Sequence, residues 1–205
     1  MMKKFLLFSS LLWALNASAQ SFDSSSRSWA VDASVNMYFI PNDFLVMPVI
    51  GFDKGRLHLE ARYNYEDLNT ASLWGGYNFE LGNKLKLEAT PMLGLVFGQT
   101  DGIAPGVEFT LSYKRLYLYH ETEYLFNFED RYSNYYYQWS ELGYSATDWL
   151  NFGLTAQKTR VFQSARDIQR GIFAGGIYKA LYLTGYYFNV FDNDRLFVFT
   201  LGVNF

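Results

Sequence analysis

The sequence of 205 residues contains no cysteine and only two histidines. Without cysteine the chain forms no disulfide bond and carries no lipid attached through a thiol. Two histidines and scattered carboxylates do not give the spacing of a metal site, so we expect no metal. Glycine pairs such as Gly75-Gly76 and Gly175-Gly176 do not form a phosphate-binding loop, and we expect no cofactor.

Basic residues are also few, with 17 lysines and arginines against 20 aspartates and glutamates. They form no basic stripe and no nucleic-acid motif, which excludes nucleic acid as a partner. After the first residues, no apolar run reaches the ~20 residues of a transmembrane helix. If the chain crosses a membrane, it must therefore do so with strands.

Residues 1–19 have the pattern of a cleaved secretory signal peptide. Lys3 and Lys4 precede the apolar run Phe5–Leu15, and Ala17-Ser18-Ala19 matches a small-residue cleavage site. We expect residues 20–205 to form a single β-barrel domain, since their number suits one domain.

The last ten residues alternate between two faces of a strand. Phe197, Phe199 and Leu201 share one face with Val203 and Phe205, and the other face is smaller or more polar. This apolar final strand, ending in phenylalanine, resembles the C-terminal signature of Gram-negative outer-membrane β-barrels. The resemblance implies an outer-membrane location, contact with outer-membrane lipid, and recognition of the last strand by the barrel-assembly machinery.

The same alternation runs through the chain and predicts an all-β fold, a transmembrane antiparallel up-and-down β-barrel of 12 strands. Aromatic residues, 20% of the chain, suit the girdles of such a barrel. We expect strands at 28–40, 43–53, 56–66, 70–82, 84–98, 104–114, 116–128, 134–146, 149–162, 168–179, 181–191 and 195–205. Four of these are ambiguous, which leaves ten or fourteen strands open, and a soluble lipocalin-like barrel with an apolar interior is the alternative fold.

The connections between these strands alternate in length. Short turns such as Lys114-Arg115 and Lys179-Ala180 follow the even strands, and most odd strands are followed by longer segments. Short periplasmic turns opposite longer outer loops are typical of bacterial barrels, and an even strand number puts both termini in the periplasm. No connection is long enough to predict a plug.

Charged residues on the expected inward faces form a belt a few residues above the short turns. Its members are Glu60, Arg62, Glu80, Lys86, Glu88, Glu108, Glu121, Glu123 and Glu141. The surplus of carboxylates predicts a narrow porin-like channel for passive passage of small solutes, with a preference for cations. The alternative is a non-conducting barrel, structural or partner-binding, whose lumen is filled by Glu–Arg and Glu–Lys pairs.

A neutral polar wall is expected opposite the belt. It comprises Asn151, Thr155, Gln157 and Thr200. Neutral polar side chains are typical of a surface that faces sugar or solvent.

Two features outside the lumen admit further interpretations. His120 and Thr122 share the expected outward face, two positions apart, as in outer-membrane lipid hydrolases that act on the bilayer with a His and a Ser. Threonine matches that pattern poorly, and we expect no enzyme. Lys158 and Arg160, high on their strand, could pair with lipopolysaccharide phosphates or remain solvated.

Overall fold

A computed structural model of the chain describes residues 28–40, 43–158, 168–191 and 194–205. The predicted signal peptide lies outside the described residues, as does Arg160. No helix in the described part of the chain is long and apolar enough to cross a membrane.

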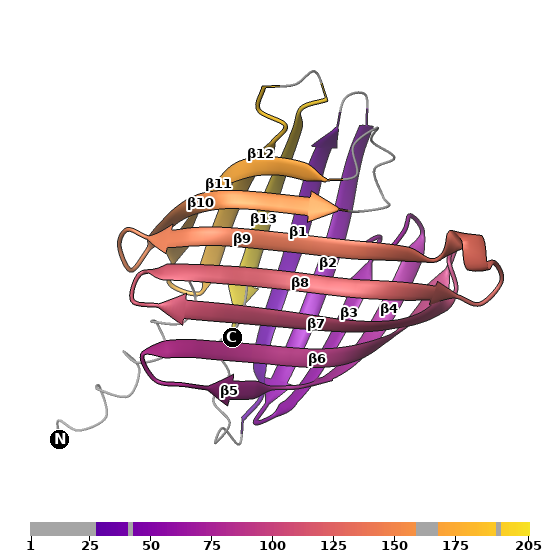
Figure 1. Ribbon diagram of the computed structural model, residues 1–205, viewed down its shortest axis with the longest axis horizontal. Coiled ribbons are helices and arrows are strands. Elements are labelled where there is room, and N and C mark those ends of the chain that lie inside the picture. Colours follow the sequence, from indigo (N-terminus) through magenta and orange to yellow (C-terminus); the bar gives the residue numbers. More distant parts are fainter. Residues whose placement is uncertain (1–27, 41–42, 159–167, 192–193) are drawn as a thin grey trace.

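Strands make up nearly all of the described chain (Figure 1). Their bounds are β1 Ala30–Ile40, β2 Asp43–Lys54, β3 Leu57–Tyr63, β4 Thr70–Tyr77, β5 Phe79–Leu81, β6 Leu85–Gly98, β7 Gly102–Tyr113, β8 Leu116–Asn127, β9 Tyr135–Ser145, β10 Leu150–Lys158, β11 Gln169–Tyr178, β12 Leu181–Phe188 and β13 Leu196–Asn204. A single 3-10 turn, η2 Arg131–Ser133, lies between β8 and β9. Segments β4 and β5 both pair with β6 and are two parts of one strand, interrupted at Asn78. The predicted number of 12 strands is therefore confirmed.

The strands close into a barrel of antiparallel neighbours. Each strand pairs with the next along the chain, β1 pairs with β13, and the β4–β6 pairing completes the ring. The ends of the described chain meet at one rim, where the backbones of Val31 and Phe205 exchange two hydrogen bonds. Closure leaves no free strand edge, which satisfies the backbone within the sheet.

The two rims differ in the length of their connections. The rim that carries the chain ends, called here the turn end, has short turns at 55–56, 82–84, 114–115, 146–149 and 179–180. Gly55, Lys114 and Lys179 adopt positive φ there, as tight hairpins of twisted strands require. The opposite rim, called here the loop end, has longer connections such as 64–69 and 128–134.

The exterior of the barrel is apolar. In β6, Leu93, Leu95 and Phe97 are about half exposed, whereas Met92 and Val96, on the opposite face, are buried in the interior. The same alternation holds in β13, where the phenylalanines predicted on one face point outward. A soluble lipocalin-like barrel is thus contradicted, because so large an exposed apolar surface suits lipid and not water.

One predicted strand is too long. The strand expected at 56–66 ends at Tyr63, and Asn64 takes a left-handed conformation with φ of 57°. The chain then turns into the barrel through residues 64–69, called here the inward segment, before β4 begins at Thr70. This brings side chains of a loop to the interior.

A charged side chain introduced on the exterior should destabilise the barrel more, the nearer it lies to the middle of the bilayer. We expect Leu201→Arg, in the middle of β13, to lower the free energy of unfolding in lipid vesicles by about 2–4 kcal/mol, since an arginine at the bilayer midplane is poorly solvated. Leu57→Arg, beside a turn, should cost at most about 1 kcal/mol. Denaturant titration of both variants measures the difference, and equal costs would contradict a lipid-facing exterior.

Candidate functional site

Arg62 of β3 is the centre of the charged interior. Its side chain is buried, and its guanidinium contacts carboxylates from β3, β7 and β8. Nη1 donates to Glu121 Oε1 at 2.9 Å and to Glu123 Oε2 at 3.1 Å, Nη2 donates to Glu108 Oε1 at 3.3 Å, and Nε donates to Glu60. We call Arg62 and these carboxylates the Arg62 cluster. The cluster ties β3 to strands with which it does not pair.

Two aromatic rings enclose the same guanidinium. Its central carbon lies 4.4 Å from the ring centroid of Tyr65 and 4.6 Å from that of Trp74. Cation–π contacts of this kind are stronger where water is excluded. Tyr65 also donates its hydroxyl to Glu121 Oε2 at 2.8 Å, so it contacts both charges of the pair.

The cluster carries a surplus of negative charge. Four carboxylates surround one guanidinium: Glu60, Glu108, Glu121 and Glu123. One oxygen of Glu123 is buried with no hydrogen-bond partner. Buried carboxylates beyond the number of cations need water, bound cations or protons to offset the charge.

The remaining belt residues lie apart from this cluster. Near the turn end, Lys86 Nζ is 3.0 Å from Glu88 Oε1 and 3.3 Å from Glu80 Oε1, and it is partly exposed. Glu141 of β9 accepts hydrogen bonds from Trp139 Nε1 at 2.9 Å and Tyr186 Oη at 2.8 Å. The residues of the predicted belt are therefore bonded in three separate groups.

A cavity of about 120 Å³ adjoins the Arg62 cluster. It lies toward the turn end, as the positions of Asp32, His58 and Glu88 near the starts of their strands indicate. Glu60, Glu108 and other acidic side chains line it. This part of the lumen is thus a polar space that can hold water.

The predicted neutral wall faces inward but is only partly in contact with this space. Thr200 lines the cavity and donates to Asn36 Oδ1 at 2.5 Å. Asn151 donates to the Tyr117 hydroxyl at 3.1 Å, and the fully buried Gln157 donates to Gln169 at 2.7 Å. Most of this wall is therefore packed against other side chains.

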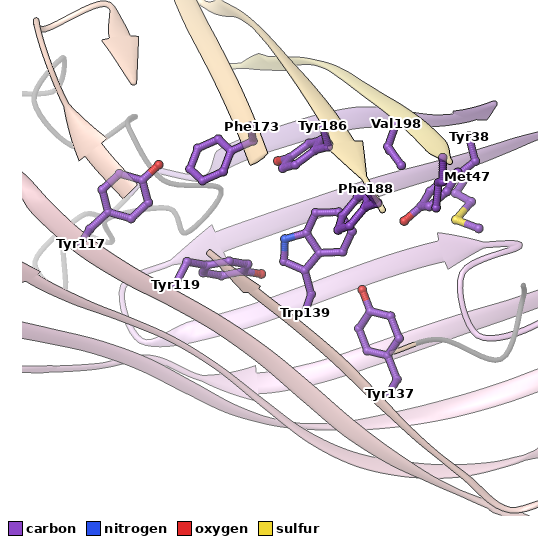
Figure 2. Close-up of a cluster of buried hydrophobic side chains, with 11 residues drawn as sticks. Tyr38, Met47, Tyr117, Tyr119, Tyr137, Trp139, Phe173, Tyr186, Phe188 and Val198 are labelled. Atoms are coloured by element: carbon purple, nitrogen blue, oxygen red, sulfur yellow. The ribbon is translucent and has the colours of Figure 1, made fainter. Parts of the chain in front are cut away.

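A cluster of buried aromatic and aliphatic side chains fills much of the interior (Figure 2). We call it the aromatic layer; it comprises Tyr38, Met47, Tyr117, Tyr119, Tyr137, Trp139, Phe173, Tyr186, Phe188, Leu196 and Val198. Trp139 lies at its centre, with ring centroids 5.0 Å from Tyr186 and 5.5 Å from Phe188. Sequence reasoning missed this layer because β12 carries aromatic residues on both faces.

A second buried cluster completes the packing toward the loop end. It contains Trp74, Met92, Val96, Ala104 and Leu125. Phe188 and Leu125 have no exposed surface. The lumen is therefore filled at the loop end, while the cavity lies nearer the turn end.

The inward segment is anchored in this packing by Glu66, a residue outside the belt predicted from the sequence. Glu66 Oε1 accepts from Ser72 Oγ at 2.5 Å and from Trp74 Nε1 at 3.1 Å, and its backbone oxygen accepts from Tyr135 Oη at 2.6 Å. A loop too short to fold into a plug thus contributes the side chains of Tyr65 and Glu66 to the interior.

The charge of Glu66 is unfavourable in this position. Burial raises the pKa of its carboxyl group, although Arg62 and the hydrogen bonds from Ser72 and Trp74 act in the opposite direction. The Glu123 carboxylate is close enough to repel it electrostatically. Oε2 of Glu66 is buried and makes no hydrogen bond.

The two histidines lie on opposite faces. His58 faces the lumen, where its Nδ1 is 2.9 Å from Asp53 Oδ1. His120 is on the outward face, and its Nδ1 is 2.9 Å from Ser140 Oγ. The Thr122 hydroxyl donates to the Tyr137 backbone oxygen at 3.0 Å, so the structure does not bring it to His120.

Lys158 is the last residue of β10 and follows the buried, inward Gln157. It therefore has the outward parity that was predicted, and its contact with lipopolysaccharide stays a prediction. In the described part of the chain, no three His, Asp or Glu side chains are arranged to hold a metal ion.

The sequence matches no protein-family model and no curated protein. Solved structures share its fold. The KdgM porin is similar with a TM-score of 0.59 at 12% identity, over 85% of this chain and 98% of that one. The KdgM porin in complex with disordered oligogalacturonate gives 0.57 at 11% identity, over 86% and 98%. The NanC porin gives 0.54 at 10% identity, over 84% and 98%. The chain therefore has the fold of small outer-membrane porins, as the resemblance in its last strand predicted.

The inward segment should loosen as pH rises. Because the pKa of Glu66 is raised on burial, ionisation opposes the closed position, which is favoured at low pH and weakened as pH rises through that pKa. We expect hydrogen-exchange protection of residues 64–69, corrected for intrinsic rates, to fall as the pH is raised from acidic to alkaline. Glu66→Gln should remove this dependence.

Glu129→Gln provides the matched control, because Glu129 is an exposed loop carboxylate. It should leave the pH dependence of the segment unchanged. If the inward segment of the Glu66→Gln variant still loosened with pH as in the wild type, the prediction would be wrong. The pH dependence would then come from the facing groups Arg62 and Glu123.

Proposed function

We propose that this protein is an outer-membrane channel that passes small solutes by diffusion and prefers cations. The observation that carries the proposal is the surplus of carboxylates around the cavity beside Arg62. A lumen meant only to be filled would be expected to balance its buried charges, because uncompensated carboxylates destabilise a dry interior. A lumen that water and cations enter tolerates the surplus.

The preference for cations follows from the sign of the lining. Carboxylates at a narrow point attract cations and exclude anions. The KdgM porin has been solved with oligogalacturonate, but a shared fold does not imply that two barrels pass the same solute. The acidic lining of this lumen would repel such an anion.

Passage through the loop end requires side chains to move. The inward segment is the part most easily displaced, because its inner residues are held by side-chain hydrogen bonds, and backbone hydrogen bonds fix only its ends, at Asn64 and Asn69. We propose that its displacement removes Tyr65 and Glu66 from the lumen and opens the path to the cavity.

The second candidate function is a non-conducting barrel that stabilises the membrane or binds a partner through its loops. The aromatic layer favours it, since buried side chains from strands all around the barrel pack together there as a permanent core would. We propose no catalytic role: the hydroxyl of Thr122 donates to the backbone, so the predicted hydrolase pair is not formed.

The cellular setting is part of the proposal. The apolar exterior supports insertion in the outer membrane of a Gram-negative bacterium, with residues 1–19 removed as a signal peptide. The turn end and both termini would then face the periplasm. The last strand would be recognised by the barrel-assembly machinery, and Lys158 and Arg160 would contact lipopolysaccharide at the loop end.

Planar-bilayer recording of the refolded chain tests the proposal. Under a KCl gradient we expect unit current steps with a reversal potential that favours cations. A Tyr65→Ala, Glu66→Ala double variant should raise the open fraction, because it removes the side chains that fill the path. Glu129→Gln should behave as the wild type.

Folding must be established independently before currents are compared, for which the gel mobility of unheated samples suffices. A folded wild type and a folded double variant that both stay silent would favour the filled, non-conducting barrel. Steps that favour anions would contradict the role given to the carboxylates.

A further inference from the structure

The cavity beside the Arg62 cluster presents polar atoms that the protein itself does not satisfy. His58 Nε2 and Thr110 Oγ1 are buried, line the cavity and have no hydrogen-bond partner. The nearest carboxylate to His58 Nε2 is that of Glu60, at 4.0 Å, which is too far for a hydrogen bond. Buried polar groups are normally satisfied, so these atoms indicate a partner within the cavity.

The carboxylates around these atoms are also incompletely engaged. Among the described interactions, Glu108 makes one hydrogen bond, at 3.3 Å, to Arg62. Strand register puts Thr110 opposite Glu88 and Glu108 opposite Thr90, so Glu88, Thr110 and Glu108 are neighbours on one wall. This wall is rich in acceptors and can receive several N–H groups at once.

Aromatic side chains line the same cavity. Tyr119, Tyr137 and Trp139 are among them. The combination of carboxylates and rings is the one that already holds the guanidinium of Arg62, between Tyr65 and Trp74. The interior of the barrel is therefore suited to a planar cation with many N–H donors.

The size of the cavity fits a small group. Its volume of about 120 Å³ is well above the roughly 10–15 Å³ that a single water molecule needs, so a group of several heavy atoms, such as guanidinium or an alkylammonium, can enter it. A metal ion fits less well, because no three ligands in the described chain are arranged for one.

We propose that this cavity binds a small organic cation through its N–H groups, with Glu108 and Glu88 as charge partners and Thr110 as a neutral acceptor. The proposal deepens the proposed function, on which it rests, by naming the class of solute that the lumen selects. Its decisive feature is hydrogen bonding, which distinguishes a site from a merely acidic pore.

Calorimetric titration of the refolded chain in detergent micelles tests binding without any current. Guanidinium at low millimolar concentration, with ionic strength held constant by KCl, is the probe. We expect saturable binding. Tetramethylammonium carries the same charge without N–H donors and should bind at least about tenfold more weakly, since charge-assisted hydrogen bonds are lost.

Two variants separate the site from the fold. Glu108→Gln should weaken guanidinium binding about tenfold or more, and Thr110→Val, which leaves the Arg62 cluster intact, should weaken it by a smaller factor. Glu129→Gln should bind as the wild type does. Equal binding of the two cations, or wild-type affinity in both site variants, would overturn the proposal.

The outcomes also separate this inference from the channel function. Cation-selective currents without guanidinium binding would contradict the proposed binding site but support the proposed channel. Guanidinium binding in a folded barrel that never conducts would support the binding site and contradict the channel.

Discussion

The guanidinium of Arg62 is buried among carboxylates from strands that do not pair with its own, and the lumen is arranged around it. Such a charge is tolerated only when every donor is used, and here Nε, Nη1 and Nη2 all contact carboxylates. Tyr65 and Trp74 complete the enclosure on the faces of the group. Removing the cation would leave the carboxylates facing one another. Tyr65 of the inward segment lies against the guanidinium and helps to hold it in place.

The contrast between Glu141 and Glu108 accounts for the division of the interior into a packed part and a hydrated part. Glu141 receives donors from both Trp139 and Tyr186 at its Oε1, so members of the aromatic layer themselves stabilise this carboxylate. Glu108 has only its long hydrogen bond to Arg62 and borders the cavity. The two carboxylates therefore differ in the number of donors that reach them.

Much of this fold follows from the period of two in a strand, which assigns each side chain to lipid or lumen without knowledge of its contacts. The inward segment escaped prediction because Arg62, Asn64 and Glu66 continue the polar alternation of β3 into the loop. Only the tendency of asparagine toward the left-handed region marks the end of the strand. The Arg62 cluster could not be predicted either. Which glutamates meet across the lumen depends on the stagger of the strands, and the stagger cannot be read from the sequence.

Because its cations are held in ion pairs, the lumen presents mainly negative charge to a solute. Read from the sequence, Arg62 and Lys86 are cations that an anionic solute could meet on its way through the barrel. In the described structure each nitrogen of the Arg62 guanidinium contacts a glutamate, and Lys86 is held between Glu80 and Glu88. An anion arriving in the cavity would therefore find carboxylates turned toward it and the positive groups already engaged. A cation would find acceptors to spare, so the electrostatics of this interior favour one class of solute although both signs of charge line it.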